Sequence, residues 1–71
     1  MTSTQLLQEI KDFNSLRDGF FNVENETNDI NIWFSRASSK WILEINCKVV
    51  KDSRLLITLV NKLQDMGFIE N

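Results

Sequence analysis

Histidine and proline are absent from this 71-residue chain, and cysteine and glycine are scarce, with one and two residues. Without histidine, a serine or cysteine nucleophile has no imidazole base in the chain, which excludes the common nucleophile–base pairs. A single cysteine excludes an intramolecular disulfide and leaves no cluster of soft metal ligands. We therefore expect a non-enzymatic protein that has no cofactor and no metal ion and folds by packing alone.

Neither sign of charge dominates. Ten acidic and eight basic side chains are spread along the chain and give a net charge of −2. Because nucleic-acid-binding domains concentrate lysine and arginine on one face, this balance makes nucleic acid an unlikely partner. No run approaches the roughly 18 apolar residues of a membrane span, and the start lacks a basic segment followed by an apolar one. We expect a cytoplasmic protein that does not bind membranes.

The length and composition predict one small globular domain over residues 1–71. A hydrophobic share of 42% is enough for a packed core. A chain of this size buries only about 60% of the surface that its unfolded form exposes, so its stability alone is marginal.

The first sixteen residues have the pattern of an amphipathic helix. Thr2 and Gln5 have the spacing of a capping box, in which each side chain bonds to the backbone N–H of the other residue. The apolar positions that follow recur at helical spacing: Leu6, Leu7, Ile10 and Phe13. Asp18 and Gly19 then favour a turn. We predict a helix over residues 4–16.

Between residues 20 and 50 the apolar period is two, which is typical of strands. Phe21 and Val23 share one face of a first strand. The inward faces of two later strands carry Ile30, Ile32 and Phe34, and then Trp41, Leu43, Ile45, Cys47 and Val49. Polar breaks at residues 25–29 and 35–40 separate the three strands. Pairing Val23 with Ile30, Phe21 with Ile32 and Phe34 with Trp41 keeps the apolar faces together.

After Val50 the helical period returns, with an apolar stripe of Leu56, Leu59, Val60, Leu63 and Met66. Asp52 or Ser53 is suited to cap this helix, and Gly67 to end it in the left-handed conformation, with Phe68 contacting Leu63. We predict a helix over residues 53–66. The predicted fold is α+β: a helix, a three-stranded antiparallel meander and a helix (αβββα).

Trp33 lies on the unexpected side of its strand. It alternates with Ile32 and Phe34, and the predicted registers place Ile42 and Phe20 beside it. One interpretation is that each face of the sheet carries one helix, so that Trp33 belongs to a second core. The second interpretation is an interface with a partner molecule, formed by Phe20, Trp33 and Ile42. The sequence favours this interpretation because tryptophan and apolar patches are enriched at protein contacts.

Cys47 and an acidic loop have both a structural and a functional interpretation. Cys47 falls between inward-facing Ile45 and Val49, so we expect a buried, unreactive thiol. Glu24, Glu26 and Asp29 surround the first hairpin. A solvated loop is the favoured interpretation there, since the spacing lacks a calcium-loop signature; cation binding or contact with a basic partner is the alternative.

Lys48, Lys51 and Arg54 gather where the third strand is expected to meet the second helix. The structural interpretation is a set of surface charges near Asp52. The functional one is a candidate anion-binding site, because a helix N-terminus favours anions.

The predicted order of elements is similar to that of the double-stranded RNA-binding domain. That family uses a Gly-Pro-x-His loop and a lysine-rich start to its last helix. This chain has no proline or histidine and offers only Lys51-Asp52-Ser53-Arg54-Leu55 at that position. The function is therefore not implied.

The whole chain resembles the small prophage-encoded YopT-like family of Bacillus-type bacteria. The resemblance is carried by the 71-residue length, by the segment Ile-Asn-Ile-Trp-Phe-Ser at residues 30–35 and by Lys-Trp-Ile-Leu-Glu-Ile at residues 40–45. It implies a homodimer of mixed α and β structure and offers no catalytic residues.

These observations predict a non-enzymatic protein-interaction module, homodimeric or bound to a host or phage protein. The alternative is a nucleic-acid-binding module that uses the three basic residues named above.

Overall fold

Residues 2–16 and 20–70, the part of the chain described by the computed structural model, form two helices and an antiparallel sheet. The first helix, α1 (Ser3–Leu16), begins at the predicted capping box. The Thr2 backbone N–H donates to Gln5 Oε1 at 2.9 Å, and the Gln5 N–H donates to Thr2 Oγ1 at 3.2 Å. Leu6 and Ile10 are fully buried, as their spacing predicts. The Phe13 side chain and the predicted turn at Asp18 and Gly19 lie outside the described residues.

Four strands follow in sequential order within the described residues: β1 (Phe21–Val23), β2 (Ile30–Ser35), β3 (Lys40–Ile45) and β4 (Lys48–Ser53). Val23 pairs with Ile30 and Phe21 with Ile32. Across the next pair, Phe34 faces Trp41 and Trp33 faces Ile42. The predicted registers and the antiparallel order are therefore confirmed.

The prediction of three strands is wrong, because residues 41–50 form two strands rather than one. The chain reverses at Asn46 and Cys47, whose φ angles are 52° and 66°. Two successive residues with positive φ are typical of a tight hairpin turn whose twist matches the flanking strands. With a fourth strand, the chain does not have the element order of the double-stranded RNA-binding domain.

The second helix, α2 (Leu56–Asp65), begins three residues later than predicted because Ser53 still belongs to β4. Its N-cap residue, Leu55, makes no side-chain capping bond, so the prediction that Asp52 or Ser53 caps the helix is wrong. The predicted C-terminus is confirmed. Gly67 has a φ of 83°, and the N–H groups of Gly67 and Phe68 donate to the carbonyls of Gln64 and Leu63, the two bonds of a Schellman motif.

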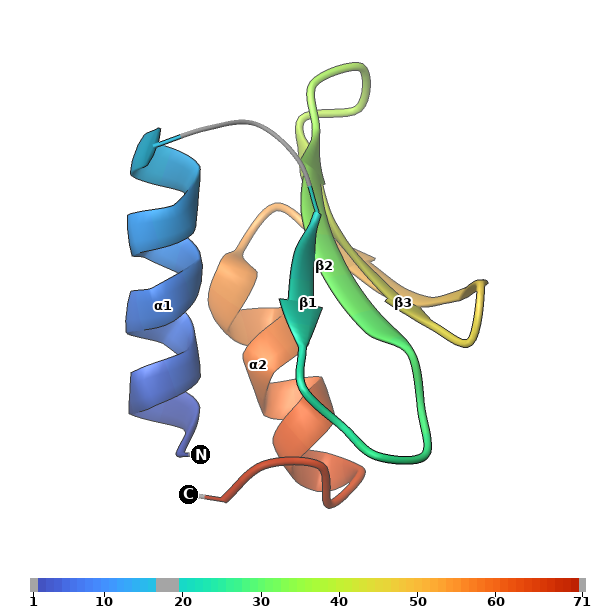
Figure 1. The fold of residues 1–71 in the computed structure, drawn as a ribbon. Helices are drawn as coiled ribbons and strands as arrows, with labels where there is room; N and C mark the ends of the chain where they lie inside the picture. Colours follow the sequence, from blue (N-terminus) through green and yellow to red (C-terminus); the bar gives the residue numbers. More distant parts are fainter. Residues whose placement is uncertain (1, 17–19, 71) are drawn as a thin grey trace.

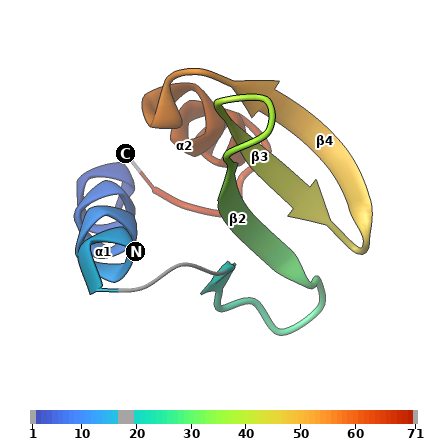
Figure 2. The ribbon, with the colours of Figure 1, turned by 90° about the horizontal axis from the view of Figure 1, so that it is seen from above.

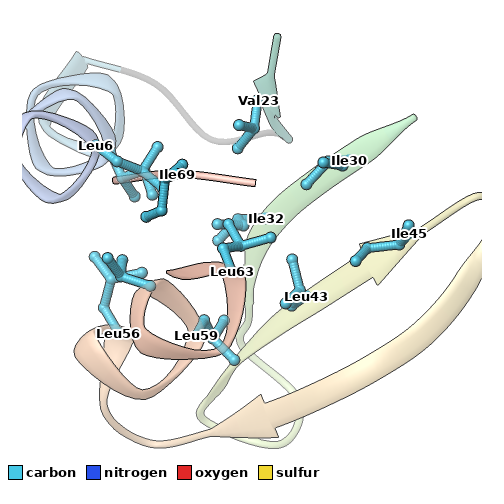
Figure 3. Packing of buried hydrophobic residues seen from close by; sticks show 12 residues of the cluster. Leu6, Val23, Ile30, Ile32, Leu43, Ile45, Leu56, Leu59, Leu63 and Ile69 are labelled. Atoms are coloured by element: carbon cyan, nitrogen blue, oxygen red, sulfur yellow. The ribbon is translucent and has the colours of Figure 1, made fainter. Parts of the chain in front are cut away.

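Both helices lie on the same face of the sheet (Figures 1 and 2). Buried side chains from both layers meet between them (Figure 3): Leu6, Ile10, Val23, Ile30, Ile32, Leu43, Ile45, Leu56, Leu59, Val60, Leu63 and Ile69. The chain ends lie side by side, since Thr2 bridges Glu70 and the Ser3 N–H donates to the Glu70 carbonyl at 2.9 Å. Neither α1 nor α2, within its described residues, combines the length and apolar character needed to cross a bilayer.

Candidate functional site: the outer face of the sheet

The sheet face opposite the helices carries the predicted interface residues side by side. Trp33 on β2 is paired with Ile42 on β3. The Phe20 ring lies 4.9 Å from the Trp33 ring, centroid to centroid, at an interplanar angle of 51°. Tilted aromatic pairs at this distance are favourable contacts. Phe20 nevertheless remains 65% exposed, whereas Trp33 and Ile42 are half-buried.

Val49 extends this apolar cluster and was missed by the sequence analysis, which placed it inward. It pairs with Glu44, which points away from the core because Leu43 and Ile45 point into it. Val49 is 60% exposed. We call Phe20, Trp33, Ile42 and Val49, together with the polar residues around them, the outer face.

Polar side chains surround the apolar residues of the outer face along the strands. On one side of the Trp33–Ile42 pair lie Asn31 and Glu44, which face each other, and on the other side Ser35 and Lys40. All four are only partly exposed. An apolar centre within a polar rim is the usual composition of a protein interface.

The hairpin turn is held to the β1–β2 loop by Asn46. Its Oδ1 accepts from the Asp29 N–H at 3.0 Å, its Nδ2 donates to Asn28 Oδ1 at 2.9 Å, and its N–H donates to the Asp29 carbonyl at 2.8 Å. Asparagine is among the few residues that adopt a positive φ readily. These bonds tie the turn that ends β3 to the loop that precedes β2.

The acidic loop between β1 and β2 is organised by asparagine side chains. Asn25 Oδ1 accepts from the N–H groups of Thr27 and Asn28, at 3.0 and 2.9 Å. The Asp29 carboxylate accepts from Asn22 Nδ2 and Asn31 Nδ2, at 3.3 and 3.2 Å. In the described part of the chain, no three histidine, cysteine or acidic side chains are grouped as a metal site requires.

The prediction that Cys47 is buried is wrong. The residue occupies the β3–β4 turn, and its side chain is exposed. The cause is the missed hairpin: the alternation from Trp41 to Ile45 does not continue through residues 46 and 47, which form the turn.

Lys48, Lys51 and Arg54 do not converge on one point. Lys48 begins β4, Lys51 lies opposite Leu43, and Arg54 follows the last residue of the strand. The length of β4, about 20 Å, separates Lys48 from Arg54. All three are exposed, and they form a row along the free edge of the sheet rather than a pocket.

Comparison of the chain with protein-family models, with curated proteins and with solved structures gives no match.

Proposed function

We propose that this protein is a non-enzymatic cytoplasmic interaction module that forms a homodimer through the outer face. The observation that carries the proposal is the packing of Trp33 against Phe20 and Ile42 on a face that neither helix covers in the described part of the chain. The YopT-like resemblance implies the same assembly, and the two segments that carry it are β2 and β3, which hold Trp33 and Ile42.

The energetics favour covering this face. Full burial of one large apolar side chain contributes about 1.5–3 kcal/mol. The chain has few other sources of stability, because a domain of this size buries a small share of its surface and its cysteine forms no internal disulfide. Trp33 and Ile42 are already half-buried, so a second copy would add only part of this value for each of them and the larger share for Phe20, which is 65% exposed.

The free edge of the sheet is less suited to assembly than the face. β4 carries Lys48 and Lys51, and its register with β3 shifts at Leu43 and Glu44, where Val50 is the extra residue. Lysine side chains and bulges on an edge strand oppose pairing with another strand. This supports association face to face rather than edge to edge.

Sedimentation equilibrium at 5–500 µM, as an order-of-magnitude range for a weak dimer, tests the proposal. We expect a dimer mass for the natural chain, and a shift toward the monomer for Trp33→Lys. Phe20→Ser is a second variant with little risk to folding, because Phe20 is exposed and lies outside β1. Leu55→Lys is the matched control, since Leu55 is 63% exposed and lies outside the outer face.

A monomer mass for the natural chain at the highest concentration would overturn the homodimer. A host or phage protein would then be the remaining occupant of the outer face. Titration with duplex RNA and DNA at low salt tests the alternative nucleic-acid function. The row of Lys48, Lys51 and Arg54 supplies at most about three phosphate contacts, so that any binding should lose affinity with a salt slope near −3.

A further inference from the structure

Strand β3 carries one charge of each sign on the outer face. Lys40, Ile42 and Glu44 alternate with Trp41, Leu43 and Ile45, which pack in or against the core, so the first three point outward. Lys40 and Glu44 lie at equal distances on either side of Ile42. Four residues of a strand span about 13 Å, so the two side chains of one copy cannot pair with each other across Ile42.

A dimer in which the same face meets itself has a twofold axis, and these charges discriminate between its orientations. If the axis lies between the two sheets and is perpendicular to the strands, the β3 strands of the two copies run antiparallel to each other. Ile42 then meets Ile42 of the second copy, and Lys40 meets Glu44 of the second copy twice, once on each side. An axis that runs along the strands instead brings Lys40 onto Lys40 and Glu44 onto Glu44.

Asp52 is a third charged residue on the strands of the outer face, and the Asp29 carboxylate, bonded to Asn31, lies at the Glu44 end of this face. Asp52 pairs with Ile42 across β3 and β4, lies on the edge strand and is exposed. In the antiparallel arrangement Asp52 lies in the same row as Trp33 and Ile42 and therefore faces Asp52 of the second copy, on the edge strand, where solvent screens the repulsion between the two carboxylates. Lys40 would meet Asp52 of the second copy only if the two sheets crossed near a right angle, which is the other common way for sheets to pack.

We infer that the second copy packs antiparallel on the outer face, with the strands aligned and with two reciprocal Lys40–Glu44 ion pairs flanking an apolar centre of Trp33 and Ile42. This inference rests on the proposed homodimer and specifies its geometry. Three strands of six residues and the three residues of β1, at about 4.8 Å between strands and about 3.3 Å per residue, give a contact of about 330 Å² per copy, which is the size of a weak, reversible contact.

Charge reversal at the two positions tests the arrangement. Lys40→Glu changes the net charge of one copy from −2 to −4, and Glu44→Lys changes it from −2 to 0. If only the net charge mattered, Lys40→Glu would dimerise more weakly than the natural chain and Glu44→Lys more tightly. The antiparallel pairs instead require both single variants to dimerise more weakly, by about tenfold in Kd, because each replaces two attractions by two repulsions at a partly exposed rim.

The double variant Lys40→Glu/Glu44→Lys restores opposite charges and a net charge of −2, so we expect its Kd to return to within about threefold of the natural value. Lys40→Glu/Asp52→Lys has the same net charge and is the matched control. Its Kd should not return to the natural value. These differences should shrink in 1 M NaCl, where the screening length is about 3 Å. Circular dichroism verifies that each variant is folded.

Three results would overturn the arrangement: tighter or unchanged dimerisation of Glu44→Lys, failure of the first double variant to recover, or recovery of the Asp52 control instead, which would indicate crossed sheets. If these occur while Trp33→Lys still dissociates the dimer, the homodimer stands and only its geometry is wrong. If Trp33→Lys leaves the mass unchanged, the proposed function itself fails.

Discussion

Asn46 is the residue at which the loss of a single side chain is expected to affect both the turn and the loop beside it. Its backbone adopts a φ of 52°, and its side chain makes two hydrogen bonds, to the Asp29 N–H and to Asn28 Oδ1. Substitution by alanine removes both side-chain bonds and leaves a residue that strongly disfavours positive φ. Substitution by glycine removes the same bonds but adopts this φ without strain.

The expected losses of stability follow from the missing hydrogen bonds and from the backbone strain at positive φ. Two hydrogen bonds at an exposed site contribute about 1–2 kcal/mol together, and a left-handed alanine costs about 1 kcal/mol more. We expect Asn46→Ala to lower the free energy of unfolding by about 2–3 kcal/mol and Asn46→Gly by about 1–2 kcal/mol. For a chain of this length, whose total stability is about 4–10 kcal/mol, the alanine variant loses a substantial fraction.

Urea unfolding followed by the fluorescence of Trp33 and Trp41 measures both values. All variants must be compared at one protein concentration, because dimerisation adds to the apparent stability. Asn61→Ala, at an exposed position of α2, is the matched control and should change the stability by less than about 0.5 kcal/mol. Equal losses for the alanine and glycine variants would refute the contribution of backbone strain, and losses near zero for both would refute that of the hydrogen bonds.

Two further outcomes test the core and the turn. Leu43→Ala, at a fully buried position of the central strand β3, should cost about 2–5 kcal/mol in urea unfolding, and a loss below about 1 kcal/mol would contradict the described core. The Cys47 thiol should react with a disulfide reagent in the folded protein within about tenfold of its rate in urea, since it is exposed, whereas a much greater protection would mean that the turn is covered.

The sequence predicted most of the sheet because the alternation of side chains between the two faces of each strand and the register between strands constrain each other. Ile30, Ile32 and Val23 have to face the same core, and a shift of one residue would turn each of them outward. The fourth strand was not predicted because the turn that creates it carries no glycine or proline. Asn46 followed by Cys47 is a weak turn signal, and apolar residues continue on both sides of it. The structure shows that interactions distant in sequence, from Asp29 and Asn28 to Asn46, compensate for the missing glycine.

The same missed turn explains the errors at the candidate site. A two-residue turn ends the alternation, so that Val49 pairs with outward-facing Glu44 instead of following Ile45 and Cys47 inward. Trp33, in contrast, lies on β2, whose bounds and register the sequence predicted. Ile42 lies on β3, whose register with β2 was predicted although its end at Ile45 was not. Both residues were assigned to the correct face. Phe20 was placed beside them by parity alone, although it precedes β1, and the Phe20–Trp33 ring contact agrees with that placement.

The arrangement of the helices bears directly on the two interpretations of Trp33. Had α1 and α2 packed on opposite faces, Trp33 would have been part of an internal core and its presence would have needed no partner. Instead both helices contribute to one core with Ile32 and Leu43. Leu6 and Ile10 of α1 and Leu59 and Leu63 of α2 are fully buried there, so moving either helix to the outer face would expose these side chains of the core. Among residues 2–16 and 20–70, neither helix supplies further burial for Trp33, which favours the interface interpretation.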